Sequence, residues 1–116
     1  MNYGSIPTNI GLAKLRNASV LGSRVDMVRV VFGDSDGVEY EPIGSETALK
    51  NQVYETAPLS IQEAGENETW VEIEAVIPHN VGGWYIREFG CYDSDGDLIF
   101  IENMPPSYKP RGEAGI

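Results

Sequence analysis

The sequence has little of what most metal and catalytic sites require. Its 116 residues include one cysteine, Cys91, and one histidine, His79. A lone cysteine cannot form an intrachain disulfide, and a lone histidine leaves a His-based metal site without its remaining ligands. We expect Cys91 to be a small buried residue of a strand and His79 to lie in a loop. No metal ion and no cofactor is therefore expected.

Basic residues are also scarce, with 8 Lys and Arg against 18 Asp and Glu and a net charge of -10. This balance disfavours binding to nucleic acid, because contacts to phosphates depend on Lys and Arg. It disfavours anionic membrane surfaces for the same reason. The sequence has no apolar run near the ~20 residues that span a bilayer and no signal-peptide pattern. We expect the protein to stay in the cytoplasm until it assembles or is released.

The length predicts one domain, and its 41% hydrophobic and 22% charged residues are typical of a folded chain. Thr8 is a suitable N-cap for a short helix over residues 8–18. Period-two or β-branched segments predict strands, with one helical turn at 45–49 and hairpin loops at 64–68 and 93–97. The expected strands cover 25–32, 52–62, 69–77, 84–92 and 98–102, and Pro105 and Pro106 are expected to leave the sheet. The predicted fold is α+β and mainly β: an N-terminal helix packed on an antiparallel sheet or sandwich of about five to seven strands.

One spacing imitates a metal site. Asp93, Asp95 and Asp97 are spaced like the first ligands of a calcium loop. Gly96 stands at the fourth position instead of the sixth, however, and the twelfth position holds Met104 in place of a glutamate. A solvated hairpin tip is the favoured interpretation.

Arg87 and Glu88 are adjacent charges within an apolar strand, so they point to opposite faces of the sheet. Two interpretations remain open. Arg87 could pair with Glu72 and Glu74 across a neighbouring strand. Alternatively, Arg87 or Glu88 could reach a subunit interface, where an ion pair fixes orientation.

Trp84 and Tyr85 follow Gly82 and Gly83, whose missing side chains allow a backbone or a neighbouring chain to approach closely. Core or interface packing is the favoured use of these aromatic side chains. Two other hypotheses stay open. Trp84 and Tyr85 could stack on sugar rings, and acids outside any motif could serve a small hydrolase, since paired carboxylates need proximity only in space. The candidate acids are Asp34, Asp36 and Asp95.

The sequence also resembles a known family. The strongest matches are Val81, Gly82, Gly83, Trp84, Ile86, Arg87, Glu88, Asp93, Asp95 to Ile99, Asn103, Pro105 and Tyr108 to Pro110. Weaker matches lie at Gly11 to Ala13, Leu15, Ala18, Gly33, Asp34, Gly37, Pro42, Thr47 to Leu49, Asn51, Val53 and Tyr54. These residues resemble the N-terminal domain of phage tail-collar and tail-fibre proteins, and the resemblance covers most of the chain.

The resemblance implies a structural virion component, not an enzyme. Such a domain attaches a tail fibre to the baseplate of a contractile phage tail or of a phage-tail-like bacteriocin (tailocin), and it is assembled in the bacterial host cytoplasm. The implied partners are a baseplate protein and further copies of the chain in a trimer with the downstream fibre shaft. Nucleic acid and membrane are not expected partners. A carbohydrate-binding module that recognises host surface glycans is the alternative.

Residues 1–7 show no periodicity and are expected to form a flexible N-terminal arm. The resemblance implies that residues 8–110 form the attachment domain and that residues 111–116 begin a linker to the shaft. The expected interface residues are Gly82, Gly83, Trp84, Tyr85, Arg87, Glu88, Tyr108 and Lys109.

Overall fold

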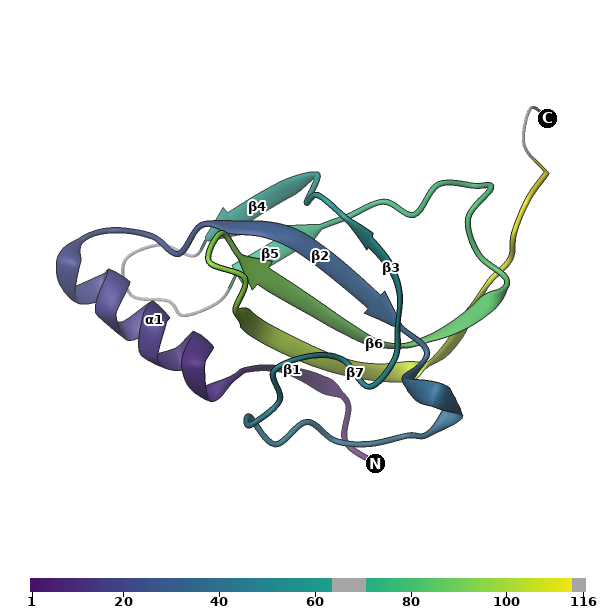
Figure 1. Cartoon of the computed structure of the whole chain (residues 1–116), viewed down its shortest axis with the longest axis horizontal. Helices are drawn as coiled ribbons and strands as arrows, with labels where there is room; N and C mark the ends of the chain where they lie inside the picture. The colour runs from purple at the N-terminus through teal and green to yellow at the C-terminus, as the bar shows by residue number, and fades with distance from the viewer. Residues whose placement is uncertain (64–70, 114–116) are drawn as a thin grey trace.

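The computed structural model describes residues 1–63 and 71–113. One helix lies beside a five-stranded antiparallel sheet of order β1-β7-β6-β2-β3, and β4 and β5 form a second sheet of two strands (Figure 1). The elements are β1 (Gly4–Pro7), α1 (Asn9–Leu21), β2 (Met27–Gly33), a 3-10 turn η1 (Ser35–Gly37), β3 (Gln52–Thr56), β4 (Ser60–Glu63), β5 (Val71–Glu74), β6 (Trp84–Asp93) and β7 (Leu98–Lys109). The predicted mainly-β α+β fold is confirmed.

The core lies on both faces of the three central strands, β2, β6 and β7. Adjacent residues of β2 serve opposite faces, since Val30 belongs to one buried cluster and Val31 to the other. Ile73 of β5 packs against the first cluster, and Leu49, from the loop before β3, belongs to the second. Cys91 is fully buried in β6 as expected, and this burial raises the pKa of its thiol to about 12.

Helix α1 is fixed to the sheet at its first turn. The Thr8 hydroxyl accepts a hydrogen bond from the Gly11 amide at 2.9 Å, and the Thr8 amide donates to the Ile99 carbonyl, also at 2.9 Å. A Cβ on Gly11 would lie 2.1 Å from the Ile99 oxygen, so only glycine permits this approach. The helix ends at Gly22, which adopts the left-handed conformation with φ 68°. The predicted start of the helix is confirmed, and its end lies three residues later than expected.

The N-terminal segment differs from the expected flexible arm. Residues 4–7 form β1, which pairs with β7 in the register Gly4 to Asn103 through Pro7 to Phe100. The Asn103 side chain accepts from the Gly4 amide at 3.0 Å and donates to the Asn2 carbonyl at 2.8 Å. This strand depends on a partner about a hundred residues away, so no local pattern in residues 1–7 could indicate it.

Two other expected strands are shorter than predicted. The segment 52–62 contains β3 and β4, which belong to different sheets and are separated by residues that include Pro58. Only residues 71–74 of the segment 69–77 are β5, while residues 69 and 70 and the expected loop 64–68 lie outside the described residues. The predicted alternation is confirmed there, because Ile73 faces the core and Glu72 and Glu74 are exposed. The helical turn expected at 45–49 does not form.

Strand β7 continues past its prolines, contrary to expectation. Its pairing with β6 shifts between Ile86, which faces Ser107, and Glu88, which faces Asn103. Three β7 residues therefore stand opposite Arg87 alone, and they include Pro105 and Pro106. Because proline has no N–H to donate, a bulge is where a ladder tolerates it.

Candidate functional site

Three of the expected interface residues form a cluster where β6 begins and β7 ends; its two tyrosines are exposed and its arginine is partly buried. Tyr85 faces Tyr108 in the register, their ring centroids are 5.0 Å apart, and the side chains are 47% and 54% exposed. The Arg87 guanidinium lies 5.2 Å from the Tyr85 ring and donates to the Asp34 carbonyl at 3.2 Å. We call Tyr85, Arg87 and Tyr108 the tyrosine cluster; partly buried Trp84 adjoins it on β6.

Gly82, Gly83 and Lys109 contact their own chain. A Cβ on Gly82 would lie 2.5 Å from the carbonyl oxygens of Lys109 and Pro110, and the Gly83 amide donates to the Lys109 carbonyl at 2.7 Å. The Lys109 ammonium donates to the carbonyls of Val81 at 2.6 Å and Pro110 at 2.8 Å. The close approach that Gly82 permits is therefore made by the end of β7, whereas a Cβ on Gly83 would meet no atom within 4 Å. His79 lies in the same exposed turn, as expected.

Glu88 is an internal anchor, whereas the sequence placed it at an interface. Its side chain is 0% exposed. One carboxylate oxygen accepts from the Lys50 amide at 2.8 Å and from the Tyr40 hydroxyl, and the other accepts from the Ser35 and Asn51 amides, each at 2.9 Å. Burial, with the hydrogen bond to Glu88, raises the pKa of Tyr40. A carboxylate with four such donors has no surface left for a partner.

Of the two interpretations left open for Arg87, the cross-strand pair with Glu72 and Glu74 is wrong. Strand β6 lies between β2 and β7, while Glu72 and Glu74 belong to the separate β4–β5 sheet. Arg87 instead meets the backbone of Asp34. The Asp34 carboxylate accepts from the Asn51 side chain at 2.8 Å and from the Asp36 amide at 2.9 Å, and these hydrogen bonds lower the pKa of Asp34.

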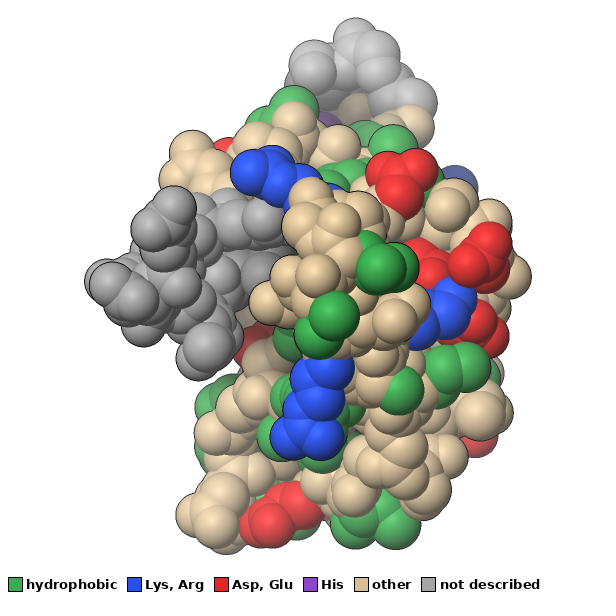
Figure 2. Space-filling model, turned by 90° about the vertical axis from the view of Figure 1, so that its left-hand side faces the viewer, with side chains coloured by type: hydrophobic (Ala, Val, Ile, Leu, Met, Phe, Trp, Pro, Cys, Tyr) green, Lys and Arg blue, Asp and Glu red, His purple; other side chains and the backbone are tan. Residues whose placement is uncertain are grey.

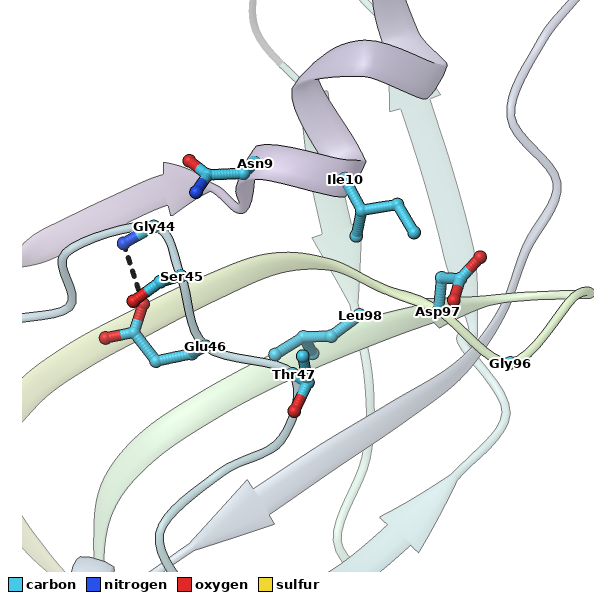
Figure 3. Close-up of a pocket in the computed structure, with 9 residues that line it drawn as sticks. All are labelled: Asn9, Ile10, Gly44, Ser45, Glu46, Thr47, Gly96, Asp97 and Leu98. Atoms are coloured by element: carbon cyan, nitrogen blue, oxygen red, sulfur yellow. Dashed lines mark hydrogen bonds between the residues drawn. The ribbon is translucent and has the colours of Figure 1, made fainter.

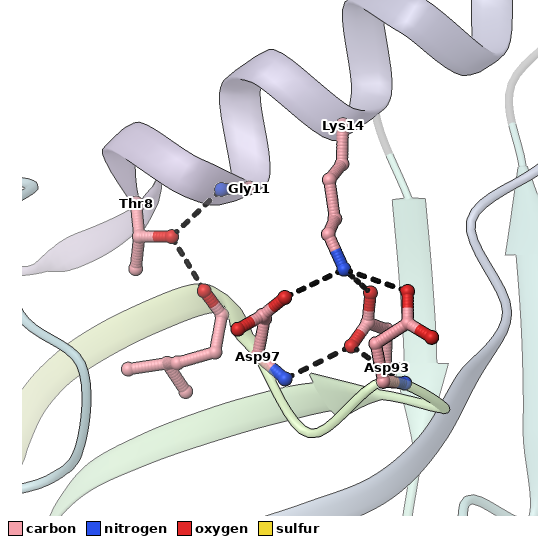
Figure 4. Close-up of polar contacts among 7 residues, drawn as sticks. Thr8, Gly11, Lys14, Asp93 and Asp97 are labelled. Carbon is pink, nitrogen blue, oxygen red and sulfur yellow. Dashed lines mark hydrogen bonds and ion pairs between the residues drawn. The ribbon is translucent and has the colours of Figure 1, made fainter.

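Lys14 occupies the centre of the calcium-like spacing. Its ammonium lies 2.6 Å from Asp93, 3.0 Å from Asp95 and 2.6 Å from Asp97 (Figure 4). Hydrogen bonds to the three carboxylates raise the pKa of Lys14. Burial alone would raise the pKa of Asp93, but the hydrogen bond from Lys14 and two backbone amides lower it. The hairpin tip is thus fastened to α1 by a side-chain cation, a contact that the sequence analysis missed.

The described residues were also compared with the requirements of a metal site. Across residues 1–63 and 71–113, no group of three or more His, Cys, Asp and Glu side chains is arranged to hold a metal ion.

A shallow hollow of about 290 Å³ lies between the start of α1, the loop before β3 and the hairpin tip (Figure 3). Its lining residues are Asn9, Ile10, Gly44, Ser45, Glu46, Thr47, Gly96, Asp97 and Leu98. Both carboxylates in it are already bound: Glu46 accepts from the Gly44 amide at 2.7 Å, and Asp97 pairs with Lys14. The hollow therefore offers no unpaired acid for acid–base chemistry.

Comparison with known proteins identifies the family of this chain. Residues 1–116 match the family described as phage tail-collar fibre protein, N-terminal. The chain belongs to this family. The tail-fibre domain is also 36% identical over 111 residues to a probable tail fiber protein of Escherichia phage P2. That match covers 95% of the domain and 17% of the relative. The family gives the tail-fibre domain a structural role in a phage tail.

The comparison with solved structures gives no match to the tail-fibre domain. In its described residues, no helix combines the length and apolar character that a membrane crossing requires.

We predict that Glu88→Gln destabilises the tail-fibre domain by about 2–4 kcal/mol, because the amide presents an N–H₂ group to donors that need an acceptor. Urea unfolding at pH 7 measures this difference. Glu102→Gln is the matched control. Glu102 is half-buried and burial raises its pKa, so removing its charge should leave stability unchanged or slightly higher. Equal midpoints for both variants would contradict the anchoring role of Glu88.

We predict that Lys14→Met lowers the urea midpoint at neutral pH, because three carboxylates lose their shared cation. The lowered pKa of Asp93 means that its stabilisation is present above the ordinary Asp pKa and is lost as the pH falls through the folded value. The gap between wild type and variant should therefore narrow below about pH 4. A gap that stays constant from pH 7 to pH 3 would show that Lys14 acts through packing of its methylene chain.

Proposed function

We propose that this tail-fibre domain attaches a fibre to the baseplate of a contractile phage tail or phage-tail-like particle, assembled in the host cytoplasm. The observation that carries the proposal is the family match over residues 1–116 to an N-terminal fibre domain. The role is structural, and no bond is made or broken. The arrangement of Asp34 and Asp95, two of the candidate hydrolase acids, supports this, since one is held by Asn51 and the other pairs with Lys14.

The proposed mechanism is rigid presentation of surfaces. Glu88 fixes the loop before β3, Lys14 fixes the hairpin tip, and Lys109 fixes the turn before β6 to the end of β7. Side chains and turns held in this way lose little further freedom on binding, so less of the contact energy is spent on ordering them. Such a domain suits a permanent joint between two parts of a particle.

The tyrosine cluster is the proposed surface for self-association in a trimer. Tyrosine and arginine are enriched at protein interfaces, where a large apolar body carries a polar tip. The cluster also lies at the end of β7, which is Lys109, and the resemblance places the fibre shaft after that residue (Figure 1). A sugar-stacking site would need an open ring face, but the Tyr85 and Tyr108 rings are tilted together and Arg87 covers Tyr85. These contacts favour a protein partner over a glycan.

We predict that purified tail particles assembled without their fibre retain this domain. Co-sedimentation of the labelled domain with such particles should saturate with increasing concentration, and an excess of unlabelled domain should displace it. The same particles carrying their fibres are the control, since their sites are filled. Absence of saturable retention on the fibreless particles would end the attachment proposal.

We predict that Tyr85→Ser with Tyr108→Ser weakens self-association, because the pair supplies the exposed aromatic area of the cluster. Sedimentation equilibrium over a range of concentrations measures the mass. Tyr3→Ser is the control, as Tyr3 is similarly exposed at 45% but lies before β1. A wild-type domain that stays monomeric throughout, or a double variant with unchanged association, would remove the cluster from the trimer interface.

A further inference from the structure

Helix α1 presents an unusual outer face. Gly11 is buried against β7 and Leu15 packs on the core, so the opposite side of the helix faces solvent. Leu12, Arg16 and Val20 follow one another at four-residue steps and therefore form one ridge on that side. Leu12 is 37% exposed and Val20 is 86% exposed. A surface helix normally turns its apolar residues inward, whereas Leu12 and Val20 of this helix face outward.

The stretch of sequence that contains α1 is richer in basic than in acidic residues. Residues 1–33 contain four basic residues and only one acidic residue, Asp26, although the net charge of the chain is -10. Helix α1 contains no acidic residue. Lys14 is held by three aspartates and Arg29 pairs with Glu55, whereas Arg16 is exposed and forms no ion pair within residues 1–63 and 71–113. An exposed arginine with no ion pair to the described residues thus lies between two exposed apolar side chains.

The position of this ridge separates it from the tyrosine cluster. In Figure 1, α1 lies at the left-hand end of the molecule, while β6 begins and β7 ends toward the right-hand end. Figure 2 views the α1 end directly. Basic and apolar side chains appear together in the middle of that face, and most acidic ones gather toward one edge. The two exposed surfaces therefore lie at opposite ends of the domain.

We propose that Leu12, Arg16 and Val20, here named the outer helix surface, dock into an acidic groove with an apolar floor on a second, different protein. The charge of the outer helix surface calls for a carboxylate partner for Arg16, and its exposed side chains call for an apolar floor. The inference rests on the proposed function, in which the partner lies on the tail side of the joint. Copies that associate through the tyrosine cluster would leave this opposite end open to such a partner.

The contacts should act together. Burial of Leu12 and Val20 supplies apolar area on either side of Arg16, and it excludes water from the arginine's ion pair. An ion pair shielded in this way is less weakened by salt than an exposed one, though not independent of it. Retention of the wild-type domain on fibreless tails should therefore decrease moderately as the salt concentration rises.

The test compares two double variants that change the net charge equally. Arg16→Glu with Val20→Gln alters the outer helix surface, and Gln is a good helix former. Arg111→Glu with Val76→Gln is the matched control, since Arg111 is exposed, Val76 is 58% exposed, and neither residue belongs to α1. Each variant is measured for retention on purified fibreless tails, for thermal unfolding, and for mass by light scattering. Leu12→Gln with Val20→Gln repeats the test if the first variant unfolds.

The inference predicts that the helix variant loses about tenfold or more in retention while the control matches the wild type, with all masses unchanged. Equal retention of both variants would overturn the helix assignment and leave the attachment proposal intact. A lower mass of the helix variant alone would overturn it too, because the surface would then bind a second copy of this chain. Failure of the wild type itself to bind would contradict the proposed function.

Discussion

The buried carboxylate of Glu88 is the interaction on which most of the loop structure depends. It gathers donors from three separate points of the chain, and Gly33 opposite it in the register must lack a side chain, since a Cβ there would lie 2.4 Å from the carboxylate. Glu88 is also connected to Asn103. The Tyr40 hydroxyl donates to Glu88, and the Tyr40 carbonyl accepts a hydrogen bond from the Asn103 side chain. One charge thus links the central strand to the loop before β3 and, through Asn103, to β1. Removing it would leave several backbone amides buried without an acceptor.

Several basic side chains of this acidic chain bind groups of the chain itself. Lys14 neutralises the hairpin tip, Lys109 binds carbonyl oxygens beside β6, and Arg29 pairs with Glu55. Among the described residues, every buried side-chain nitrogen or oxygen has a hydrogen-bond partner. The tyrosine cluster and the outer helix surface stand out against this background, since each exposes apolar side chains beside an arginine. That contrast, more than any single contact, is the reason we propose them as surfaces for partners.

Features set by neighbouring residues could be predicted from the sequence. The alternation of β5, the Thr8 cap and the turn between β6 and β7 each depend on side chains a few positions apart. Features set by distant partners could not. Strand β1 exists only because β7 is beside it, Pro105 is tolerated because a bulge needs no donor there, and Glu88 is internal because its donors lie 37 to 53 residues away. Gly82 was correctly predicted to allow a close approach, but pattern alone cannot tell a neighbouring chain from the chain's own end.

Strand β7 connects the outer helix surface with the tyrosine cluster, and this connection affects how a fibre joint would carry mechanical load. Strand β7 receives the start of α1 at Ile99 and reaches the Gly83 turn at Lys109. Between these points it is hydrogen-bonded to β6 over most of its length and to β1 near its start. If a fibre pulls on the end of β7 while α1 is held, the load runs along the strands and must shear many hydrogen bonds at once. A joint built on a hairpin edge would instead open one bond at a time, so the central position of β7 suits the proposed attachment.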